Sequence, residues 1–158
     1  MKAIVTGSFD PITKGHLEIV KYASENFDTV YVVALINEEK DYMFTMQQKK
    51  ELIKATTSEF KNVIADAYNG LTADYMHQKN IFTIIRGVRN PQDEEYEQAL
   101  AQKMKEFDNR FETVIIKTSE EFKNISSSKV REKIRNNEEL SCFLHQNAID
   151  LVKKYQKN

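Results

Sequence analysis

Cysteine is nearly absent from this sequence, since Cys142 is the only one among 158 residues. A single thiol cannot form a disulfide within the chain, and so little cysteine is typical of proteins that work in a reducing compartment. The sequence also lacks any apolar run long enough to cross a bilayer, and no leader-like segment precedes its first predicted strand. These absences predict a cytoplasmic protein that does not enter a membrane.

An excess of charge of either sign is also absent. The formal net charge is −1, although 30% of the residues are charged. Broad binding to nucleic acids or anionic membranes needs an excess of basic residues, so the composition argues against both partners. Hydrophobic residues make up 41% of the chain, enough for a core, and no repeat, low-complexity tract or linker interrupts it. We therefore expect one domain over residues 1–158.

Predicted strands and helices alternate along the chain. Short segments rich in β-branched and aromatic residues predict strands over 2–6, 29–35, 63–68, 81–85 and 113–117. Helical patterns cover 17–27, 45–57, 71–79, 90–107, 127–136 and 148–155. The strands are apolar runs rather than clean alternations, which is typical of parallel strands covered on both faces. Repeated β-α-β units predict an α/β fold: a Rossmann-like, doubly wound, parallel five-stranded sheet with helices on both faces.

Capping signals mark several helix starts. Thr45 and Gln48 have the spacing of a capping box, and Asn90-Pro91 combines a cap with proline at the first helical position. The helix that begins there carries apolar residues at helical spacing, which predict a stripe facing the core: Tyr96, Leu100, Met104 and Phe107.

Glycine and proline are scarce, and their positions are informative. All of them fall in segments that follow a predicted strand or open the next helix: Gly7, Gly15, Gly70, Gly87, Pro11 and Pro91. In open α/β sheets ligands bind at the carboxyl ends of the strands. We expect one rim there that carries a histidine, a lysine, two arginines and a serine cluster.

The loop 6–16 after the first strand holds the densest chemistry. Gly7 predicts a tight turn and close approach of a ligand, and Thr13 is placed to cap the following helix. That puts His16 in the first turn, beside free N–H groups and the positive end of the helix dipole. Such a site suits a phosphate that gains charge during a reaction. Asp10 is interpreted as a residue that shapes the loop.

Arg86 and Arg89 straddle Gly87 as the chain leaves the fourth predicted strand. Arginine offers a fixed fork of donors that matches phosphate oxygens. The alternative is that both arginines pair with acidic neighbours in the segment 93–95.

The segment 124–128 carries three serines at a helix start, which can cap the helix or leave hydroxyl and N–H groups for a phosphate. Lys40 lies in a charged stretch, where a lysine is usually solvated. His77 and His145 lie far from these motifs in the sequence and are interpreted as ordinary helix or loop residues.

Gly7-Ser8-Phe9-Asp10-Pro11 followed by Thr13-Lys14-Gly15-His16 resembles the first signature of the nucleotidyltransferase superfamily. The segment Ile85–Arg89, followed by Tyr96-Glu97, resembles that of the phosphopantetheine adenylyltransferases. Ile125–Ser128 resembles the superfamily signature that contacts ATP. The resemblance runs from Gly7 to Arg131, with the motifs in order, and so implies a single nucleotidyltransferase domain.

The resemblance implies reversible transfer of the adenylyl group from ATP to 4′-phosphopantetheine, giving dephospho-coenzyme A and pyrophosphate. It implies catalytic roles for His16, Lys40 and Arg86. The phosphopantetheine-binding residues it implies are Ser8, Lys40, Thr72 and Arg86. The ATP-binding residues it implies are Ser8, Phe9, His16, Gly87, Val88, Arg89, Glu97, Phe122, Lys123, Asn124, Ile125, Ser126, Ser127 and Ser128. It further implies Mg²⁺ carried by ATP without protein ligands, coenzyme A as a feedback ligand, and a homohexamer.

Two alternatives remain open at this point. A cytidylyltransferase or a nicotinate-mononucleotide adenylyltransferase shares the first and third signatures, although the 86–90 segment argues against both. A non-catalytic nucleotide-binding module is the other, and the intact His16 argues against it.

Overall fold

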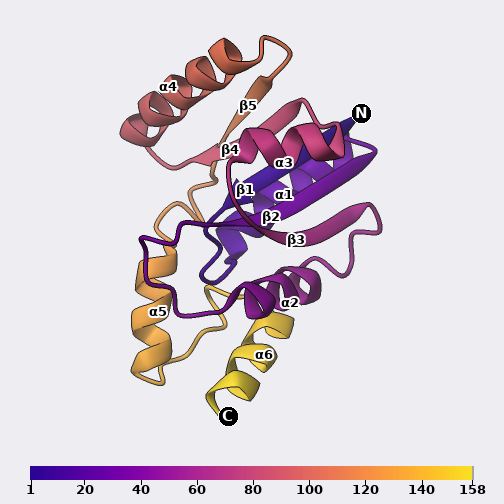
Figure 1. Ribbon diagram of the computed structural model, residues 1–158. Coiled ribbons are helices and arrows are strands. Elements are labelled where there is room, and N and C mark those ends of the chain that lie inside the picture. Colours follow the sequence, from indigo (N-terminus) through magenta and orange to yellow (C-terminus); the bar gives the residue numbers. More distant parts are fainter. Residues whose placement is uncertain (158) are drawn as a thin grey trace.

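The computed structural model describes residues 1–157, which form a five-stranded sheet with every strand parallel to its neighbours. The strands are β1 (Lys2–Gly7), β2 (Thr29–Ile36), β3 (Val63–Asn69), β4 (Thr83–Val88) and β5 (Glu112–Lys117). Their order across the sheet is β3-β2-β1-β4-β5 (Figure 1). The chain therefore builds outward from β1 on one side, then returns to place β4 on the other. The strand order reverses between β1 and β4, which is where open α/β sheets bind ligands.

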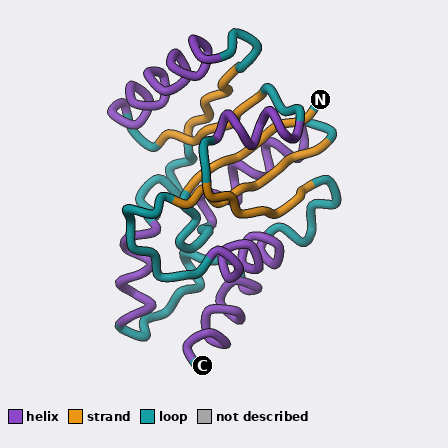
Figure 2. The backbone as a smooth tube through the Cα atoms, in the orientation of Figure 1, coloured by secondary structure: helices purple, strands orange, loops and turns teal. Residues whose placement is uncertain are grey.

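Helices cover both faces of the sheet, as the backbone trace in Figure 2 makes clear. One face is covered by α1 (Lys14–Asn26) and α2 (Met46–Thr56), and the other by α3 (Thr72–Lys79) and α4 (Pro91–Phe107). α5 (Ser127–Arg135) and α6 (Gln146–Gln156) join the core on the α1 and α2 side and extend beyond the sheet (Figure 1). Within β1, Ala3 and Val5 pack into the first core while Ile4 packs into the second. Both sides of the strand are buried, which explains the continuous apolar run and confirms the predicted fold class.

The predicted helix caps are confirmed. The side chains of Thr13, Thr45, Asn90 and Ser126 each accept a hydrogen bond from a backbone N–H in the first turn of α1, α2, α4 and α5 respectively. These bonds satisfy N–H groups that a helix start otherwise leaves without partners. They also fix where the first turn of α1 begins, and so place His16.

Strand β4 starts and ends later than the sequence predicted. Arg86 and Gly87 were expected to follow the strand, but they lie inside it, opposite Ile115 and Ile116 of β5. A glycine beside arginines indicated the end of a strand, whereas pairing with β5 extends the ladder through Val88. The arginine is consequently fixed by a sheet rather than carried on a loop.

The predicted core stripe of α4 is wrong for Tyr96 and Phe107, whereas Met104 does pack against the second core. Tyr96 and Phe107 are 63% and 62% exposed, and Leu100 and Met104 are only partly buried. The buried residue of this helix is Glu97. In Figure 1, α4 lies beside β5 at one edge of the sheet, and no other helix covers its outer side. An apolar helical pattern shows that a face favours burial but does not say which partner covers it.

Among the helices of residues 1–157, none combines the length and the apolar character that spanning a bilayer requires.

Candidate active site

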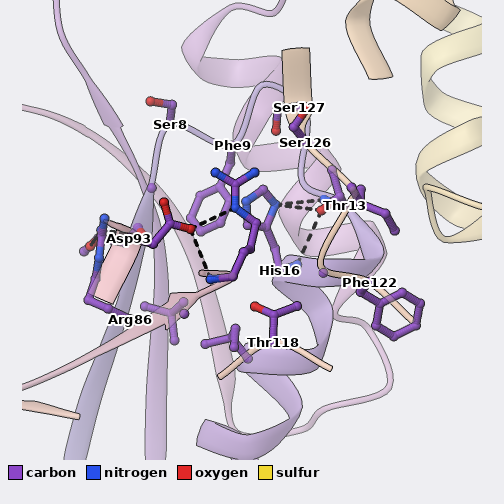
Figure 3. Close-up of a pocket in the computed structure, with 18 of the residues that line it drawn as sticks. Ser8, Phe9, Thr13, His16, Arg86, Asp93, Thr118, Phe122, Ser126 and Ser127 are labelled. Atoms are coloured by element: carbon purple, nitrogen blue, oxygen red, sulfur yellow. Dashed lines mark hydrogen bonds and ion pairs between the residues drawn. The ribbon is translucent and has the colours of Figure 1, made fainter. Parts of the chain in front are cut away.

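A cavity of about 480 Å³ opens at the carboxyl ends of β1 and β4, beside the start of α1. Figure 3 shows side chains from distant parts of the sequence around this space. The predicted site residues that line it are Ser8, Phe9, His16, Arg86, Gly87, Arg89, Glu97, Phe122, Ile125, Ser126, Ser127 and Ser128. The rim expected from the positions of glycine and proline is therefore present at β1, β4 and the segment after β5.

Some predicted residues lie elsewhere. Lys40, Val88, Lys123 and Asn124 are not among the described residues that line this cavity. Thr72 lines an adjoining cavity of about 120 Å³ together with Thr6, Arg86 and Glu97. Arg86 and Glu97 line both cavities and thus form part of the wall between them.

His16 is held by the cap of its own helix. The backbone N–H of Thr13 donates to Nδ1 of His16 at 3.0 Å, while the Thr13 hydroxyl accepts from the His16 backbone N–H at 3.4 Å. Phe9 packs edge-on against the imidazole, with ring centroids 4.9 Å apart. Figure 3 shows the imidazole between Phe9 and Thr13. Because Nδ1 accepts a hydrogen bond, the neutral ring carries its proton on Nε2.

The surroundings of His16 favour its neutral form. Burial, together with the nearby guanidinium groups of Arg86 and Arg89, lowers the pKa of His16 to about 4. The ring lines the cavity, and the residue as a whole is partly buried. At neutral pH the ring is thus an uncharged hydrogen-bond donor with a fixed orientation.

The tight turn in loop 6–16 falls at Phe9 rather than at Gly7. Phe9 adopts a left-handed backbone with φ of 44°, while Gly7 ends strand β1 in register with Ala34. A Cβ added at Gly7 would meet the Phe9 ring at 3.4 Å, an ordinary contact. Left-handed phenylalanine is uncommon and costs free energy, so the surrounding contacts must hold it.

Arg86 uses most of its donors within the protein. Its Nε and Nη2 donate to the two carboxylate oxygens of Glu97 at 2.9 and 2.7 Å, and Nη1 donates to the carbonyl and hydroxyl oxygens of Thr6. Five N–H groups make up a guanidinium, so one on Nη2 remains. Glu97 is 6% exposed, and Arg86 already occupies its carboxylate.

Arg89 pairs with Asp93, whose carboxylate accepts from Nε at 3.0 Å and from the Arg89 backbone N–H at 3.1 Å. The Arg89 hydrogen bond lowers the pKa of Asp93. The alternative stated above, pairing with acids of the segment 93–95, is confirmed for Arg89 only, because the partner of Arg86 is Glu97, outside that segment. Both cations nonetheless line the cavity.

Gly87 makes room for α1. A Cβ at this position would lie 2.9 Å from two side-chain carbons of Ile19. The atoms that need this space belong to the helix that carries His16. Gly87 thus lets α1 pack closely against β4.

The serine hydroxyls hold the start of α5 in place. Ser126 accepts from the Lys129 backbone N–H, Ser127 donates to the Pro11 carbonyl at 3.0 Å, and Ser128 accepts from Nη2 of Arg131. The amino end of α5 therefore borders the cavity and adds the positive end of a helix dipole to it.

Two cations hold this loop in place, and sequence reasoning assigned neither of them a role at the site. Arg131 lines the cavity and donates to the Asp10 carbonyl at 2.9 Å. Lys49 is fully buried on α2 and donates to the Ser8 carbonyl at 2.9 Å. No motif marks Lys49, and only its place at a helical core position could have drawn attention to it. Asp10 shapes the loop, as interpreted, because its carboxylate accepts the backbone N–H groups of Met43 and Phe44.

The other histidines lie outside the cavity lining. His77 pairs with Asp108 at 2.9 Å and stacks on Phe111, and His145 caps α6. Within residues 1–157, no three His, Cys, Asp or Glu side chains gather into a metal-binding group. The carboxylates that line the cavity, Asp93 and Glu97, each pair with an arginine.

Comparisons with known proteins agree with this geometry. The cytidylyltransferase-like family model matches residues 4–133. A phosphopantetheine adenylyltransferase of Clostridium novyi (strain NT) is 42% identical over 130 residues, which is 82% of this chain and 81% of that protein. A solved structure from Vibrio parahaemolyticus, provisionally assigned as a nicotinate-nucleotide adenylyltransferase, aligns with a TM-score of 0.73 at 17% identity, over 97% of this chain and 91% of that one. At so low an identity this last match shows the fold alone.

Proposed function

Because the chain belongs to the cytidylyltransferase-like family of nucleotidyltransferases, we propose that it transfers the adenylyl group of ATP to 4′-phosphopantetheine. The products are dephospho-coenzyme A and pyrophosphate, and the reaction is reversible. The observation that carries this assignment is the 42% identity to a relative of that name over most of both chains. The protein is thus an adenylyltransferase of coenzyme A biosynthesis.

The site fits a reaction that needs charge stabilisation more than a base. The attacking atom is an oxygen of the acceptor's phosphate, which is already anionic. His16 would donate its Nε2 proton in a hydrogen bond to an α-phosphate oxygen, where negative charge grows in the transition state. A neutral donor whose orientation is fixed by Thr13 needs no reorganisation to do this. Catalysis then rests on positioning and electrostatics.

In this proposal the two substrates occupy the two cavities that Arg86 and Glu97 separate. We assign ATP to the larger cavity, along Phe9, Gly87, Arg89 and the start of α5, and the pantetheine arm to the smaller cavity beside Thr72. The remaining N–H of Arg86, together with Lys40, would hold the acceptor phosphate between them. Lys40 lies in the exposed segment after β2, so this role requires its side chain to reach in from the rim. Ser8 would lie between the two reactants.

Mg²⁺ fits this site as a companion of ATP. Because arginines already engage Asp93 and Glu97, the cavity offers the ion no uncommitted carboxylate among the described residues. The phosphates of ATP would hold it, and it would offset their charge. Mg²⁺ commonly binds proteins in this way.

We also propose that the chain assembles into a homohexamer in the cytoplasm and binds coenzyme A as a feedback ligand. The exposed Tyr96 and Phe107 of α4 support association, since a second copy would remove them from water. Coenzyme A contains the product's own adenylyl and pantetheine groups, so the same cavities could take it.

Acceptor-dependent release of pyrophosphate tests the proposed function. Purified protein with ATP should release pyrophosphate only when 4′-phosphopantetheine is added, and dephospho-coenzyme A should form in equal amount. Parallel reactions with nicotinate mononucleotide, or with CTP in place of ATP, test the related enzymes. Faster turnover in either would reassign the substrate, and no turnover with any pair would leave a nucleotide-binding module.

A further inference from the structure

Lys49 is a buried cation that contacts the loop before His16. Its side chain is 0% exposed, and its ammonium donates to the Ser8 carbonyl at 2.9 Å. The same ammonium lies 3.3 Å from the centre of the Tyr42 ring. Burying a charged lysine is costly, and a hydrophobic residue of similar size would fill this position at lower cost. The ammonium must therefore do something that a hydrophobic side chain does not.

The contact fixes the direction of one peptide group. The C=O and N–H of a trans peptide point to opposite sides. The Ser8 carbonyl points to Lys49, which is not among the described residues lining the cavity, so the N–H of Phe9 points away from Lys49. Within residues 1–157 this N–H donates no hydrogen bond, and Phe9 itself lines the cavity. The left-handed backbone at Phe9 belongs to the same turn.

We propose that Lys49 is a positioning residue that holds the Ser8–Phe9 peptide so that the Phe9 N–H donates to a phosphate oxygen of ATP. This inference rests on the proposed function for the identity of the nucleotide. The hydrogen bond from the Lys49 ammonium to the Ser8 carbonyl stabilises the strained turn at Phe9. Without it the turn would relax, and the Phe9 N–H would no longer point into the cavity. Lys49 does not touch the substrates, and it acts through the backbone.

Lys49 also links two loops of the rim. Tyr42, beneath its ammonium, accepts a hydrogen bond from the Asn37 backbone N–H at 2.9 Å. Asn37 and Tyr42 flank Lys40, so the buried lysine joins the Ser8 loop to the segment that carries the proposed acceptor-phosphate lysine. Loss of the ammonium should therefore affect both loops.

The charged groups around Lys49 make the effect depend on pH. Burial lowers the pKa of Lys49 to about 8, with the Asp10 carboxylate opposing this shift and the Arg131 guanidinium adding to it. Tyr42 is the remaining titratable side chain in contact with the ammonium. Above about pH 8 the ammonium loses its charge, and its hold on the Ser8 carbonyl weakens. Arginine at the same position would stay charged.

The test compares Lys49→Met and Lys49→Arg with a control, Lys50→Met. Lys50 is the next residue on α2, is about half exposed, and makes only a 3.8 Å ion pair with Asp66. Calorimetry with ATP should show an affinity at least about tenfold lower for Lys49→Met, the loss expected for one charged hydrogen bond. Lys49→Arg and Lys50→Met should bind within about threefold of the wild type. The wild-type affinity should fall between pH 7.5 and 9, and that of Lys49→Arg should not.

A second measurement uses the wild-type protein and so does not depend on the variants folding. The chain has nine phenylalanines, so labelling with ¹⁵N-phenylalanine gives few amide signals, and Phe9→Leu identifies the signal of Phe9. ATP should shift the Phe9 amide signal strongly. A folded Lys49→Met protein with wild-type ATP affinity, or a Phe9 amide that ATP leaves unmoved, overturns the proposal. If the wild type binds ATP but makes no dephospho-coenzyme A, the proposed function fails, and the ATP titrations still decide the role of Lys49.

Discussion

The backbone N–H of Thr13 donates to Nδ1 of His16 at 3.0 Å, and this hydrogen bond decides which nitrogen of the imidazole carries the proton. The hydrogen bonds that cap α1 are therefore the same ones that orient the candidate catalytic donor, His16. Thr13 ends the loop, starts α1, and leaves the other ring nitrogen free to donate toward a ligand. The chemistry of the site follows from the same contacts that begin a helix.

His16 should be neutral at pH 7 and protonated on Nε2. Its pKa, lowered to about 4 by burial and by Arg86 and Arg89, predicts that the ring stays uncharged through the range where an ordinary histidine titrates. Nitrogen NMR of ¹⁵N-histidine-labelled protein measures both properties, with His77→Gln and His145→Gln to assign the signals. A His16 signal that titrates near pH 6.5, or a proton on Nδ1, would contradict this assignment.

The lowered pKa of His16 should also make the stability of the fold depend on pH in the acid range. The native pKa of His16 lies below its ordinary value of 6.5, so the unfolded chain binds the proton more tightly between about pH 4 and 6.5. The free energy of unfolding should therefore fall as the pH is lowered through this window. Urea unfolding of His16→Gln should lack this contribution, so the stability difference between variant and wild type should change across the window and stay constant above pH 7.

Replacing His16 should damage turnover far more than binding. Loss of one preorganised donor to a developing charge typically costs about 10²–10³-fold in rate. We expect His16→Ala to lose this much in kcat while its affinity for ATP changes by much less. His77→Ala is the matched control, because His77 pairs with Asp108 away from the cavity lining. Near-wild-type turnover by His16→Ala would remove His16 from the mechanism.

Arg86 and Glu97 should depend on each other for stability. Arg86→Met leaves the carboxylate of Glu97 buried without its partner, which should cost about 3 kcal/mol of unfolding free energy. Glu97→Met should cost a similar amount, and the double variant should cost less than the sum, because no charge is left unpaired. Arg89→Met, from the more exposed pair with Asp93, should cost less than about 1 kcal/mol.

Activity should separate the two roles of Arg86. The double variant should recover stability without recovering turnover, and its defect should lie more in use of phosphopantetheine than in binding of ATP. Urea unfolding and steady-state kinetics with each substrate varied make the comparison. Strict additivity in stability, or a defect confined to ATP, would reassign the arginine.

The exposed apolar residues of α4 should lie at a contact between subunits. Sedimentation of the wild type should show a closed oligomer, and Phe107→Glu should shift it toward smaller species. Tyr22→Glu, at an exposed aromatic on α1, is the control and should leave the assembly intact. A wild-type monomer at micromolar concentration would refute the proposed assembly.

Much of the fold could be predicted because local signals and the global pattern agree. Apolar runs mark strands buried on both faces, and Thr13, Thr45 and Asn90 mark helix starts through hydrogen bonds that span only three residues. The end of β4 was missed because its pairing with β5 joins residues far apart in the sequence. The exposed side of α4 was missed because an apolar stripe looks the same whether a core or another subunit covers it.

In the site, too, features that depend on neighbouring residues could be predicted, whereas contacts between distant residues could not. The sequence places His16 and its cap correctly, since both depend on one helix turn. It does not reveal that Arg86 forms an ion pair with Glu97, because that pair depends on how α4 packs on β4. Nor does it mark Lys49, whose importance comes from a backbone carbonyl 41 residues away in the chain.

The most direct test of the central claim follows the α-phosphorus of ATP. With ATP labelled at that atom and 4′-phosphopantetheine as acceptor, the wild type should place all transferred label in dephospho-coenzyme A and none in the pyrophosphate released. His16→Ala should form the same product at least about a hundredfold more slowly. Label that stays in ADP, AMP or unreacted ATP, while the wild type binds both substrates, would contradict adenylyl transfer as the activity of this protein.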